Sequence, residues 1–412
     1  MSDAVVSPQS GASAGPPAGE VILAGNGPGE LQGWIAPVAR AARALGGGEA
    51  SGIRITLALT PTQFAGGRER AVAESWLLFD HILDPTASLR ISLGLQRYAV
   101  RQPGVLVHLG GDLLLSGRLA TKLGIPAFAF AETDLIARRH GHFRRIFAAT
   151  EPLARVLAAR GVPGDHIVVT GDPRGDLVAG PIARTTRAAS EAFIVSFLPG
   201  SRDRFFAILA PYFLETARAL TRRLPAVRPQ FLISEFLTPS LVESFTAAVR
   251  TASDGAPAGW RVEQGWEAVG RSDFAVTIPG TNTLELGMAG VPFAVVVPTQ
   301  HLARMPLEGL LEWVARLPGL GYRLRHAGLR SHLRRERFLA IPNKRAGRPI
   351  VPEWIGPLDP EDVAARVTIV LQDEPALAVM AGSLRALGLA RPGASALIAA
   401  EALRVASPAL TR

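Results

Sequence analysis

The sequence predicts an α/β protein made of two domains in tandem, each with a parallel sheet. Short apolar stretches of strand length alternate with amphipathic stretches of helix length, which is typical of parallel sheets covered by helices. The alternation stops near Val178 and restarts at Phe193. A chain of 412 residues is also long enough for two domains of ordinary size. We expect the ligand-binding edges of the two sheets to face one another across a cleft.

The composition narrows the class of protein. Apolar residues make up 48% of the chain and charged residues 19%, so each domain can bury a core. The net charge of +9 favours anionic partners such as nucleic acid, phosphorylated substrates or an acidic membrane surface, without choosing among them. The absence of cysteine excludes disulfides and thiolate metal sites, and the eight histidines show no metal-ligand spacing. We therefore expect neither a metal site nor a cofactor.

The amino terminus does not read as a targeting signal. Residues 1–18 are rich in Ala, Gly, Ser and Pro and lack the basic and apolar segments of a signal peptide, so we expect a disordered leader. No apolar run reaches the roughly 18 residues that a membrane-spanning helix needs. The sequence predicts a cytoplasmic protein, with peripheral contact at the inner face of the cytoplasmic membrane as an option.

The first domain opens with a strand, a glycine-containing loop and a helix. The loop is Asn26-Gly-Pro-Gly29, where Gly29 permits close approach of a ligand, and Glu30 begins a helix predicted to end near Leu45. Such a turn is also common in parallel sheets that bind nothing there. Further strands are expected at 53–59, 104–110, 125–131, 146–149 and 167–170, with helices at 113–123 and 152–160.

Two more features of this domain carry candidate chemistry. Asp112 follows a strand, where functional groups of parallel sheets lie, but it is equally a candidate N-cap of the next helix. Arg138 and Arg139 open a basic cluster that extends to Arg145. The cluster suits an anionic substrate or lipid head group, and it also suits a solvated surface. Residues 178–190 are rich in Ala, Arg and Thr and are expected to form the linker.

The second domain begins with a predicted phosphate loop. Pro199-Gly-Ser-Arg202 follows the strand predicted at 193–198 and precedes a helix predicted at 205–224. Gly200 permits the turn, Ser201 and backbone N–H groups suit a phosphate, and Arg202 offers a bidentate guanidinium to a diphosphate. The alternative is a surface loop with an incidental arginine. Further strands are expected at 231–234, 261–263, 274–278 and 293–297.

A second candidate site lies between the last two of these strands. Pro279-Gly280 breaks the strand, Thr281 or Asn282 can cap the next helix, and Glu285 falls in its first turn. The start of such a helix offers free N–H groups to an anion at the sheet edge. The carboxylate of Glu285 is placed to accept hydrogen bonds from a sugar hydroxyl. An ordinary βαβ turn with a well-capped helix remains the alternative.

The rest of the chain departs from the sheet pattern. Residues 300–337 form an amphipathic and then strongly basic insertion, which suits an anionic membrane surface or a helix packed on its own domain. Asn343 lies in a Pro-Asn turn that could orient the polar edge of a ligand. Helices predicted at 363–371, 375–387 and 394–405 suggest no chemistry, and residues 386–412 are expected to form a helical tail.

The order of these motifs resembles the lipid-A-disaccharide synthase family. The resemblance rests on Phe197-Leu-Pro-Gly-Ser-Arg202, then Ser272-Asp with Pro279-Gly-Thr-x-Thr-Leu-Glu285, then Leu339-x-Ile-Pro-Asn343 with Ala346-Gly-Arg348 and Glu353. Gly111-Asp112, Gly171-Asp172 and Gly175-Asp176 fall where the family carries similar short motifs. The similarity spans roughly residues 20 to 385 and is more specific in the carboxy-terminal half.

The resemblance implies a GT-B glycosyltransferase with two Rossmann-like domains. Residues 19–180 would form the acceptor side and residues 190–385 would bind the UDP-sugar. The implied reaction moves an acylated glucosamine from UDP to an acylated glucosamine phosphate at the membrane, with inversion and without an obligatory metal. The donor-binding residues implied by position are Gly200, Ser201, Arg202, Gly280, Thr281, Asn282, Thr283, Glu285, Asn343 and Arg348. Asp112 would be the base, and Gly29, Glu30, Arg138 and Arg139 lie on the acceptor side.

The sequence departs from the family pattern on the acceptor half. The family continues Gly-Glu with x-Ser-Gly-Asp, whereas Gly29-Glu30 is followed here by Leu31-Gln-Gly-Trp34. A tryptophan-containing segment expected near residue 137 is replaced by Ile136-Ala-Arg138-Arg139, and the basic insertion before Phe338 is longer than the family suggests. The acceptor therefore stays open. A UDP-sugar epimerase on the same fold and a non-catalytic nucleotide-sugar or membrane-binding module are the alternatives; no nucleic-acid motif supports nucleic-acid binding.

Overall fold

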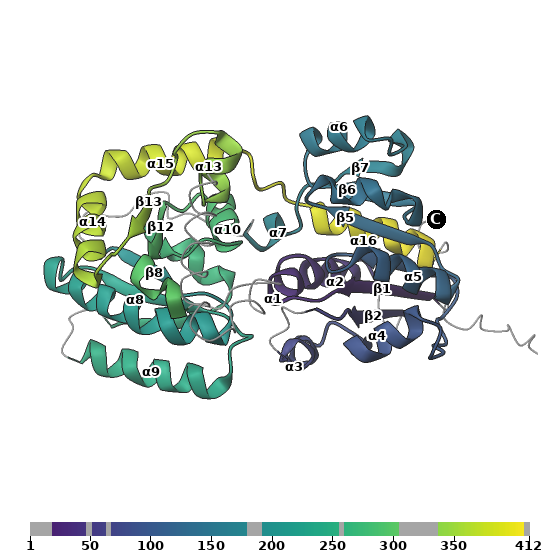
Figure 1. The fold of residues 1–412 in the computed structure, drawn as a ribbon, viewed down its shortest axis with the longest axis horizontal. Helices are drawn as coiled ribbons and strands as arrows, with labels where there is room; N and C mark the ends of the chain where they lie inside the picture. The colour runs from purple at the N-terminus through teal and green to yellow at the C-terminus, as the bar shows by residue number, and fades with distance from the viewer. Residues whose placement is uncertain are drawn as a thin grey trace, which may run out of the picture.

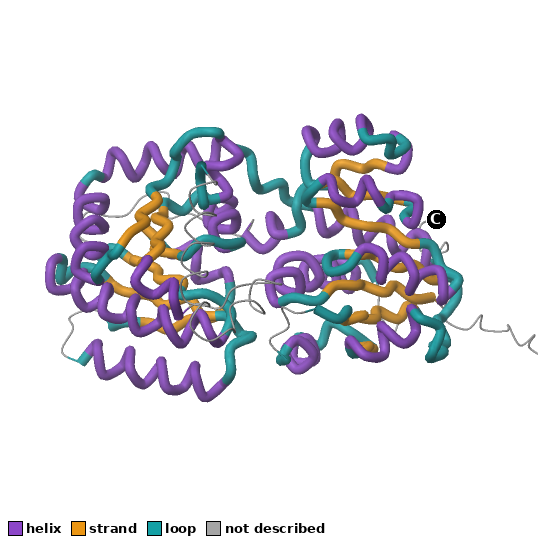
Figure 2. Tube along the Cα trace, viewed as in Figure 1, coloured by secondary structure: helices purple, strands orange, loops and turns teal. Residues whose placement is uncertain are grey.

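The computed structural model describes residues 19–46, 52–62, 67–178, 192–254, 259–304 and 337–407. These residues form two sheets, each lying between layers of helices (Figures 1 and 2). All strand pairs given for both sheets are parallel, as the sequence predicts. The predicted leader, nearly all of the predicted linker and most of the predicted basic insertion lie outside the described residues.

The amino-terminal sheet has seven strands in the order β3-β2-β1-β4-β5-β6-β7. Its strands are β1 (Gly19–Gly25), β2 (Ile53–Leu59), β3 (His81–Leu83), β4 (Gly104–His108), β5 (Ala127–Ala131), β6 (Arg145–Ala148) and β7 (Ile167–Val169). The chain order reverses between the neighbours β1 and β4, so the loops after these two strands flank a crevice at the sheet edge. The sequence did not predict β3, which is only three residues long.

The helices predicted at 113–123 and 152–160 are present, together with helical elements that the sequence did not predict. The helical elements of this half are α1 (Pro28–Glu30), η1 (Leu31–Ile35), α2 (Ala36–Ala44), α3 (Glu69–Ser75), α4 (Pro85–Ser92), α5 (Leu113–Leu123), η3 (Asp134–Arg138), η4 (His140–His142), α6 (Glu151–Ala159), η5 (Gly164–His166) and α7 (Arg174–Val178). The helix predicted to open at Glu30 instead starts at Pro28 and contains a π-helical turn, η1, before α2. That turn buries Trp34 against the junction of the two halves.

The carboxy-terminal sheet has six strands in the order β10-β9-β8-β11-β12-β13. Its strands are β8 (Ile194–Leu198), β9 (Arg228–Ile233), β10 (Arg261–Gln264), β11 (Phe274–Thr277), β12 (Phe293–Pro298) and β13 (Glu353–Gly356). The helical elements are α8 (Asp203–Arg223), α9 (Pro239–Ser253), η6 (Trp266–Arg271), α10 (Asn282–Ala289), η7 (Thr299–Arg304), α13 (Ile341–Ala346), α14 (Pro360–Gln372) and α15 (Glu374–Ala386). The central strands β8 and β11 place the two predicted ligand loops side by side.

The last helix, α16 (Ala394–Ala406), returns to the amino-terminal half, where it appears in yellow among the purple and blue elements (Figure 1). The apolar side of α16 is buried in the same core as Val21 and Val38. Asp176 accepts hydrogen bonds from the backbone N–H groups of Gly393, just before α16, and of Ser395, in its first turn. The tail is therefore part of the first core, and the chain passes between the halves twice.

No single helix in the described ranges is long and apolar enough to cross a membrane. Helices α14 and α15 together satisfy the length and composition criteria, but they meet at an angle of 89°.

Candidate functional site

A cleft of about 530 Å³ lies between the carboxyl edges of the two sheets. This volume falls within the roughly 300–1,000 Å³ of typical small-molecule sites. The amino-terminal half lines the cleft with Asn26, Gly27, Pro28, Gly29, Glu30, Trp34, Glu132 and Arg174, and the carboxy-terminal half with Gly200, Ser201, Arg202, Phe205, Ile278, Pro279, Gly280, Thr281 and Asn282. The structure thus brings both predicted loops of the second half to one wall, opposite the predicted loop of the first.

The loop after β8 forms one part of that wall. Gly200 adopts φ +109°, a conformation that favours glycine, and a Cβ there would come within 3.1 Å of Ile278. Arg202 is the N-cap residue of α8, and its guanidinium lies 6.0 Å from the ring centroid of Phe205. The loop therefore offers backbone N–H groups, the Ser201 hydroxyl and a guanidinium at the positive end of a 21-residue helix.

The start of α10 forms the neighbouring part of the wall. Gly280 has φ +151°, and Thr281 is the N-cap residue but makes no side-chain capping bond. The predicted side-chain cap is therefore wrong, and the side chains of Thr281 and Asn282 line the cleft instead. Thr283 points inward, where its hydroxyl donates to Gly280 O at 2.8 Å and accepts from Ile341 N at 3.1 Å.

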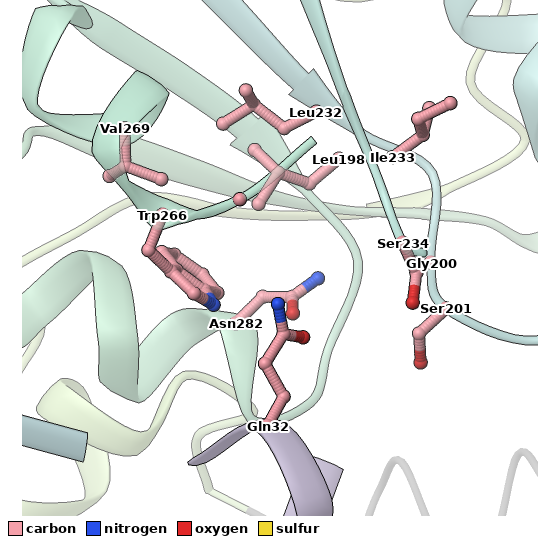
Figure 3. A pocket seen from close by; sticks show the side chains of 11 residues that line it. Gln32, Leu198, Gly200, Ser201, Leu232, Ile233, Ser234, Trp266, Val269 and Asn282 are labelled. Carbon is pink, nitrogen blue, oxygen red and sulfur yellow. The ribbon is translucent and has the colours of Figure 1, made fainter. Parts of the chain in front are cut away.

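A smaller cavity of about 60 Å³ adjoins the cleft and shares Gly200, Ser201 and Asn282 with it (Figure 3). The indole of Trp266 forms one side, and Gln32 reaches toward Asn282 from the amino-terminal half. The sequence did not indicate either residue. Trp266 follows β10 as the predicted loops follow their strands, so the same rule for parallel sheets was the signal available for it.

On the opposite wall, Glu30 holds the first loop together. Its Oε2 accepts from Asn26 N at 2.9 Å and from Gly27 N at 3.2 Å, and its Oε1 accepts from Gly111 N at 3.1 Å. Gly29 lies where the two halves approach one another, since a Cβ there would stand 3.8 Å from the Thr281 hydroxyl. Both predicted acceptor-side loop residues therefore line the cleft, and the Glu30 carboxylate is occupied by backbone donors.

Besides Thr283 and Glu285, five predicted residues lie away from the described lining of the cleft. Asp112 is the N-cap of α5, accepting from Leu115 N at 2.8 Å, and Arg138, Arg139 and Arg348 are exposed. Asn343 is buried in α13. Its amide donates to Val351 O and Glu353 Oε1, each at 2.9 Å, and accepts from Ile350 N and Val351 N. The nitrogen and the oxygen of the amide both make these bonds, which hold α13 beside β13. The Pro-Asn turn that was predicted to orient a ligand therefore has a structural role.

Four charged side chains and one indole, which we call the cleft charge cluster, form the floor of the cleft between the halves. The cluster consists of Trp34, Glu132, Asp172, Arg174 and Glu285. Arg174 Nη1 donates to Glu132 Oε1 at 3.1 Å and to Asp172 Oδ2 at 3.3 Å, while Trp34 Nε1 donates to Asp172 Oδ1 at 3.0 Å. The guanidinium also lies over the Trp34 ring, 4.2 Å from its centroid. The sequence analysis did not single out Glu132 or Arg174.

Gly33 explains how Arg174 fits against η1. A Cβ at Gly33 would come within 2.9 Å of Arg174 Nε and 3.0 Å of its Cγ, so a larger residue would push the guanidinium away. Arg174 is only 2% exposed, and its Nε has no hydrogen-bond partner in the described part of the chain. The fold therefore holds one cation in a fixed place between carboxylates from both halves.

The carboxyl groups of this cluster differ from ordinary surface ones. Burial raises the pKa of Glu285 to about 7, against the opposing attraction of Arg174. Burial likewise raises the pKa of Asp172, again with Arg174 opposing. Burial disfavours the Arg174 cation, but Asp172, Glu132 and Glu285 together raise its pKa above the usual value. Glu285 is 5% exposed and is absent from the described cleft lining, so its carboxylate lies behind the wall rather than on it.

No group of three His, Asp or Glu side chains in the described residues is arranged to hold a metal ion.

The sequence relatives of the chain are lipid-A-disaccharide synthases. The family model described as lipid-A-disaccharide synthetase matches residues 182–305, which include the loops at 199–202 and 279–282. The chain is 29% identical over 266 residues to the lipid-A-disaccharide synthase of Syntrophus aciditrophicus (strain SB), covering 62% of each chain and thus less than two thirds of that enzyme. It is also 29% identical over 305 residues to that of Anaeromyxobacter sp. (strain K), covering 71% of this chain and 72% of the relative.

The fold is shared with a wider group of solved structures. A putative UDP-N-acetylglucosamine 2-epimerase from Listeria monocytogenes superposes with a TM-score of 0.54 at 13% identity, covering 94% of this chain and 96% of that one. This likeness confirms the predicted fold class, and the sequence matches confirm the predicted family resemblance. In sequence the chain is similar to lipid-A-disaccharide synthases, and its fold has the two Rossmann-like domains of the GT-B arrangement.

Proposed function

We propose that the protein is an inverting glycosyltransferase that moves a glucosamine-type sugar from UDP to a lipid-linked or membrane-proximal acceptor. One observation carries the proposal: the loops that contain the family motifs, at Gly200–Arg202 and Gly280–Asn282, line one wall of a 530 Å³ cleft. The family match covers this wall, so it favours sugar transfer over the epimerase reaction that the shared fold alone would also allow.

The donor is proposed to lie along the carboxy-terminal wall. The diphosphate would be bound by the Ser201 hydroxyl, the backbone N–H groups of both loops and the Arg202 guanidinium, at the positive ends of α8 and α10. The smaller cavity beside it would take the nucleobase against Trp266, since an indole face supports stacking of a flat ring. The sugar would then project toward the amino-terminal wall.

Transfer requires two kinds of help. The departing UDP gains negative charge, which Arg202 and the N–H groups would stabilise as the bond to the sugar breaks. The acceptor hydroxyl must lose a proton to a carboxylate near the sugar, and Asp112 is the group that the family resemblance assigns to this step. Arg138 and Arg139 are the proposed contacts to an anionic acceptor.

Product analysis tests the proposal. The protein would be incubated with UDP-N-acetylglucosamine and its acylated derivatives, together with lipid acceptors extracted from membranes. We expect free UDP and a lipid heavier by one sugar residue. A changed sugar still joined to UDP would contradict transfer and indicate an epimerase. Tight binding of UDP without turnover of any donor would indicate a non-catalytic nucleotide-sugar module.

The proposed site of action is the inner face of the cytoplasmic membrane. The net charge of +9 and the lipid character of the proposed acceptor support contact with an anionic surface. Sedimentation with anionic and neutral vesicles measures it, and we expect binding to the anionic vesicles only. A variant without the arginines between Arg323 and Arg337 should lose that preference. Equal partitioning of the variant and the wild type would contradict a role for these arginines.

A further inference from the structure

We propose that Glu132 is the catalytic base that removes the proton from the acceptor hydroxyl. The proposal rests on the glycosyl transfer proposed above. Glu132 directly follows β5 in the amino-terminal sheet, and its side chain lines the cleft that the donor loops line from the other side. It therefore occupies the wall from which an acceptor would meet a sugar bound along the carboxy-terminal wall.

Two carboxylates lie on the described surface of the cleft, and only one is available for chemistry. Glu30 accepts three backbone N–H bonds with its two oxygens. Glu132 uses Oε1 to accept from Arg174, and within the described residues no hydrogen bond or ion pair involves its Oε2. The side chain is 28% exposed, so Oε2 can meet a ligand in the cleft. A base needs this combination of an anchored carboxylate and an oxygen open to the substrate.

The cleft charge cluster fixes the position of Glu132. Arg174 is 2% exposed and is itself held by Asp172 and by the face of Trp34, so it cannot swing away from the Glu132 carboxylate. Asp172 and Glu285 lie close enough to Glu132 for its carboxylate to influence both of their pKa values. We infer that Arg174 is a positioning residue that keeps the Glu132 carboxylate oriented before the acceptor arrives.

The proposed step exchanges one bond at C1 of the sugar for another and moves one proton. The acceptor oxygen forms a bond to C1 of the sugar while the bond from C1 to the β-phosphate oxygen breaks, and the bonding electrons leave with UDP. The acceptor hydroxyl proton moves to Glu132 Oε2. After the product departs, the carboxyl group returns this proton to water. No oxidant, reductant or additional reactant takes part.

Asp112 is less well placed for this step. Its Oδ1 accepts from Leu115 N as the cap of α5, and the residue does not contribute to the described lining of the cleft. Glu132 and Asp112 both belong to loops that follow strands of the same sheet, so the sequence rule that selected Asp112 applies equally to Glu132. The difference between them comes from what each carboxylate contacts.

Glu132→Gln tests the assignment, because it keeps the shape and removes the basic oxygen. With the wild type as reference, we expect turnover to fall roughly 100- to 10,000-fold, the usual contribution of general base catalysis, while UDP affinity stays within about threefold. Glu151→Gln is the matched control, since Glu151 is an exposed glutamate of the same domain, and it should leave turnover unchanged. Turnover of Glu132→Gln close to that of the wild type would overturn the assignment.

A second variant separates catalysis from a structural effect. In Glu132→Ala, azide can enter the space left by the carboxylate and attack C1 without needing a base. We expect azide to release UDP and form a glycosyl azide of inverted configuration in this variant, and not in the wild type. Loss of turnover without any azide product, in a variant with normal thermal unfolding and UDP binding, would count against Glu132 as the base. If the wild type neither binds UDP nor transfers sugar, the proposed function fails and the assignment falls with it.

Discussion

The two walls of the cleft come from sheets of the same design but present different surfaces. The carboxy-terminal wall consists of glycines, hydroxyl side chains and helix starts around Gly200 and Gly280. The amino-terminal wall has a carboxylate, Glu132, backed by a buried guanidinium, Arg174. The carboxy-terminal wall suits an anionic ligand, because its N–H groups and helix ends need little desolvation to bind one. The amino-terminal wall holds the buried Arg174 guanidinium in place before any ligand binds. We infer that one wall is built to bind and the other to orient a reacting group.

The largest expected effect is on the amino-terminal wall. Arg174→Ala leaves Asp172 and Glu132 without their cation, and breaking a buried ion pair costs about 3–5 kcal/mol. Urea unfolding monitored by circular dichroism would measure this loss. Arg218→Ala is the matched control, because Arg218 pairs with Glu215 on the exposed side of α8, and it should cost no more than about 1 kcal/mol. A loss below about 1 kcal/mol for Arg174→Ala would contradict the role of the cluster.

Glu285 predicts a pH dependence for the same cluster. Its folded pKa of about 7 lies above the ordinary glutamate pKa of 4.5, so folding favours the protonated form. The stabilisation from this group is therefore complete below pH 4.5 and is lost as the pH rises through about 7, a change of about 3 kcal/mol. Glu285→Gln keeps a neutral side chain at every pH, so its stability relative to the wild type should rise across this window. A constant difference between the two unfolding curves from pH 4.5 to 8 would contradict the account.

On the carboxy-terminal wall, the expected effect is on binding instead of folding. Arg202→Ala removes the proposed charge-assisted contact to the diphosphate, so UDP affinity should fall by about 1.5–3 kcal/mol with little change in thermal unfolding. Isothermal titration calorimetry measures the affinity. Arg250→Ala on α9 removes an exposed arginine of the same domain and should leave UDP binding unchanged. Equal affinities for Arg202→Ala and Arg250→Ala would exclude Arg202 from the donor site.

The smallest expected effect is at Asp112. Asp112→Ala removes the N-cap of α5 and should cost about 1 kcal/mol of stability, whereas Asp112→Asn keeps a capping oxygen and should cost only a few tenths. Thermal unfolding distinguishes these two variants. The turnover of Asp112→Asn also tests the base role that the family resemblance assigns. A loss of turnover as large as that of Glu132→Gln would return the base to Asp112.

The loops of the carboxy-terminal wall could be predicted because their signals are local. Strand, glycine turn and helix start follow one another within a few residues at Gly200 and at Gly280, and the parallel-sheet rule then places both loops at one edge. The prediction was less successful for side-chain direction. Asn343 turns into the protein, where it bonds to Val351 and Glu353, and Glu285 is buried behind the wall.

The charge cluster behind the amino-terminal wall could not be predicted because its contacts join distant parts of the chain. Trp34 and Asp172 are separated by 138 positions, and Arg174 contacts Glu132 across 42. No pattern of spacing within a helix or strand reveals such pairs. The short strands β3 and β13 and the return of α16 to the first core escaped prediction for the same reason, since each depends on partners that are remote in sequence.

Hydrogen exchange with and without saturating UDP is the most direct test of whether UDP binds along the carboxy-terminal wall, because it reports where the nucleotide binds. Peptides that cover residues 198–205 and 278–285 are predicted to exchange more slowly with UDP, because backbone N–H groups at these two loops would bind the diphosphate. Peptides from the exposed helix α9 should be unaffected. Protection confined to the amino-terminal wall, or no protection at either loop, would contradict the assignment of the carboxy-terminal wall to the donor.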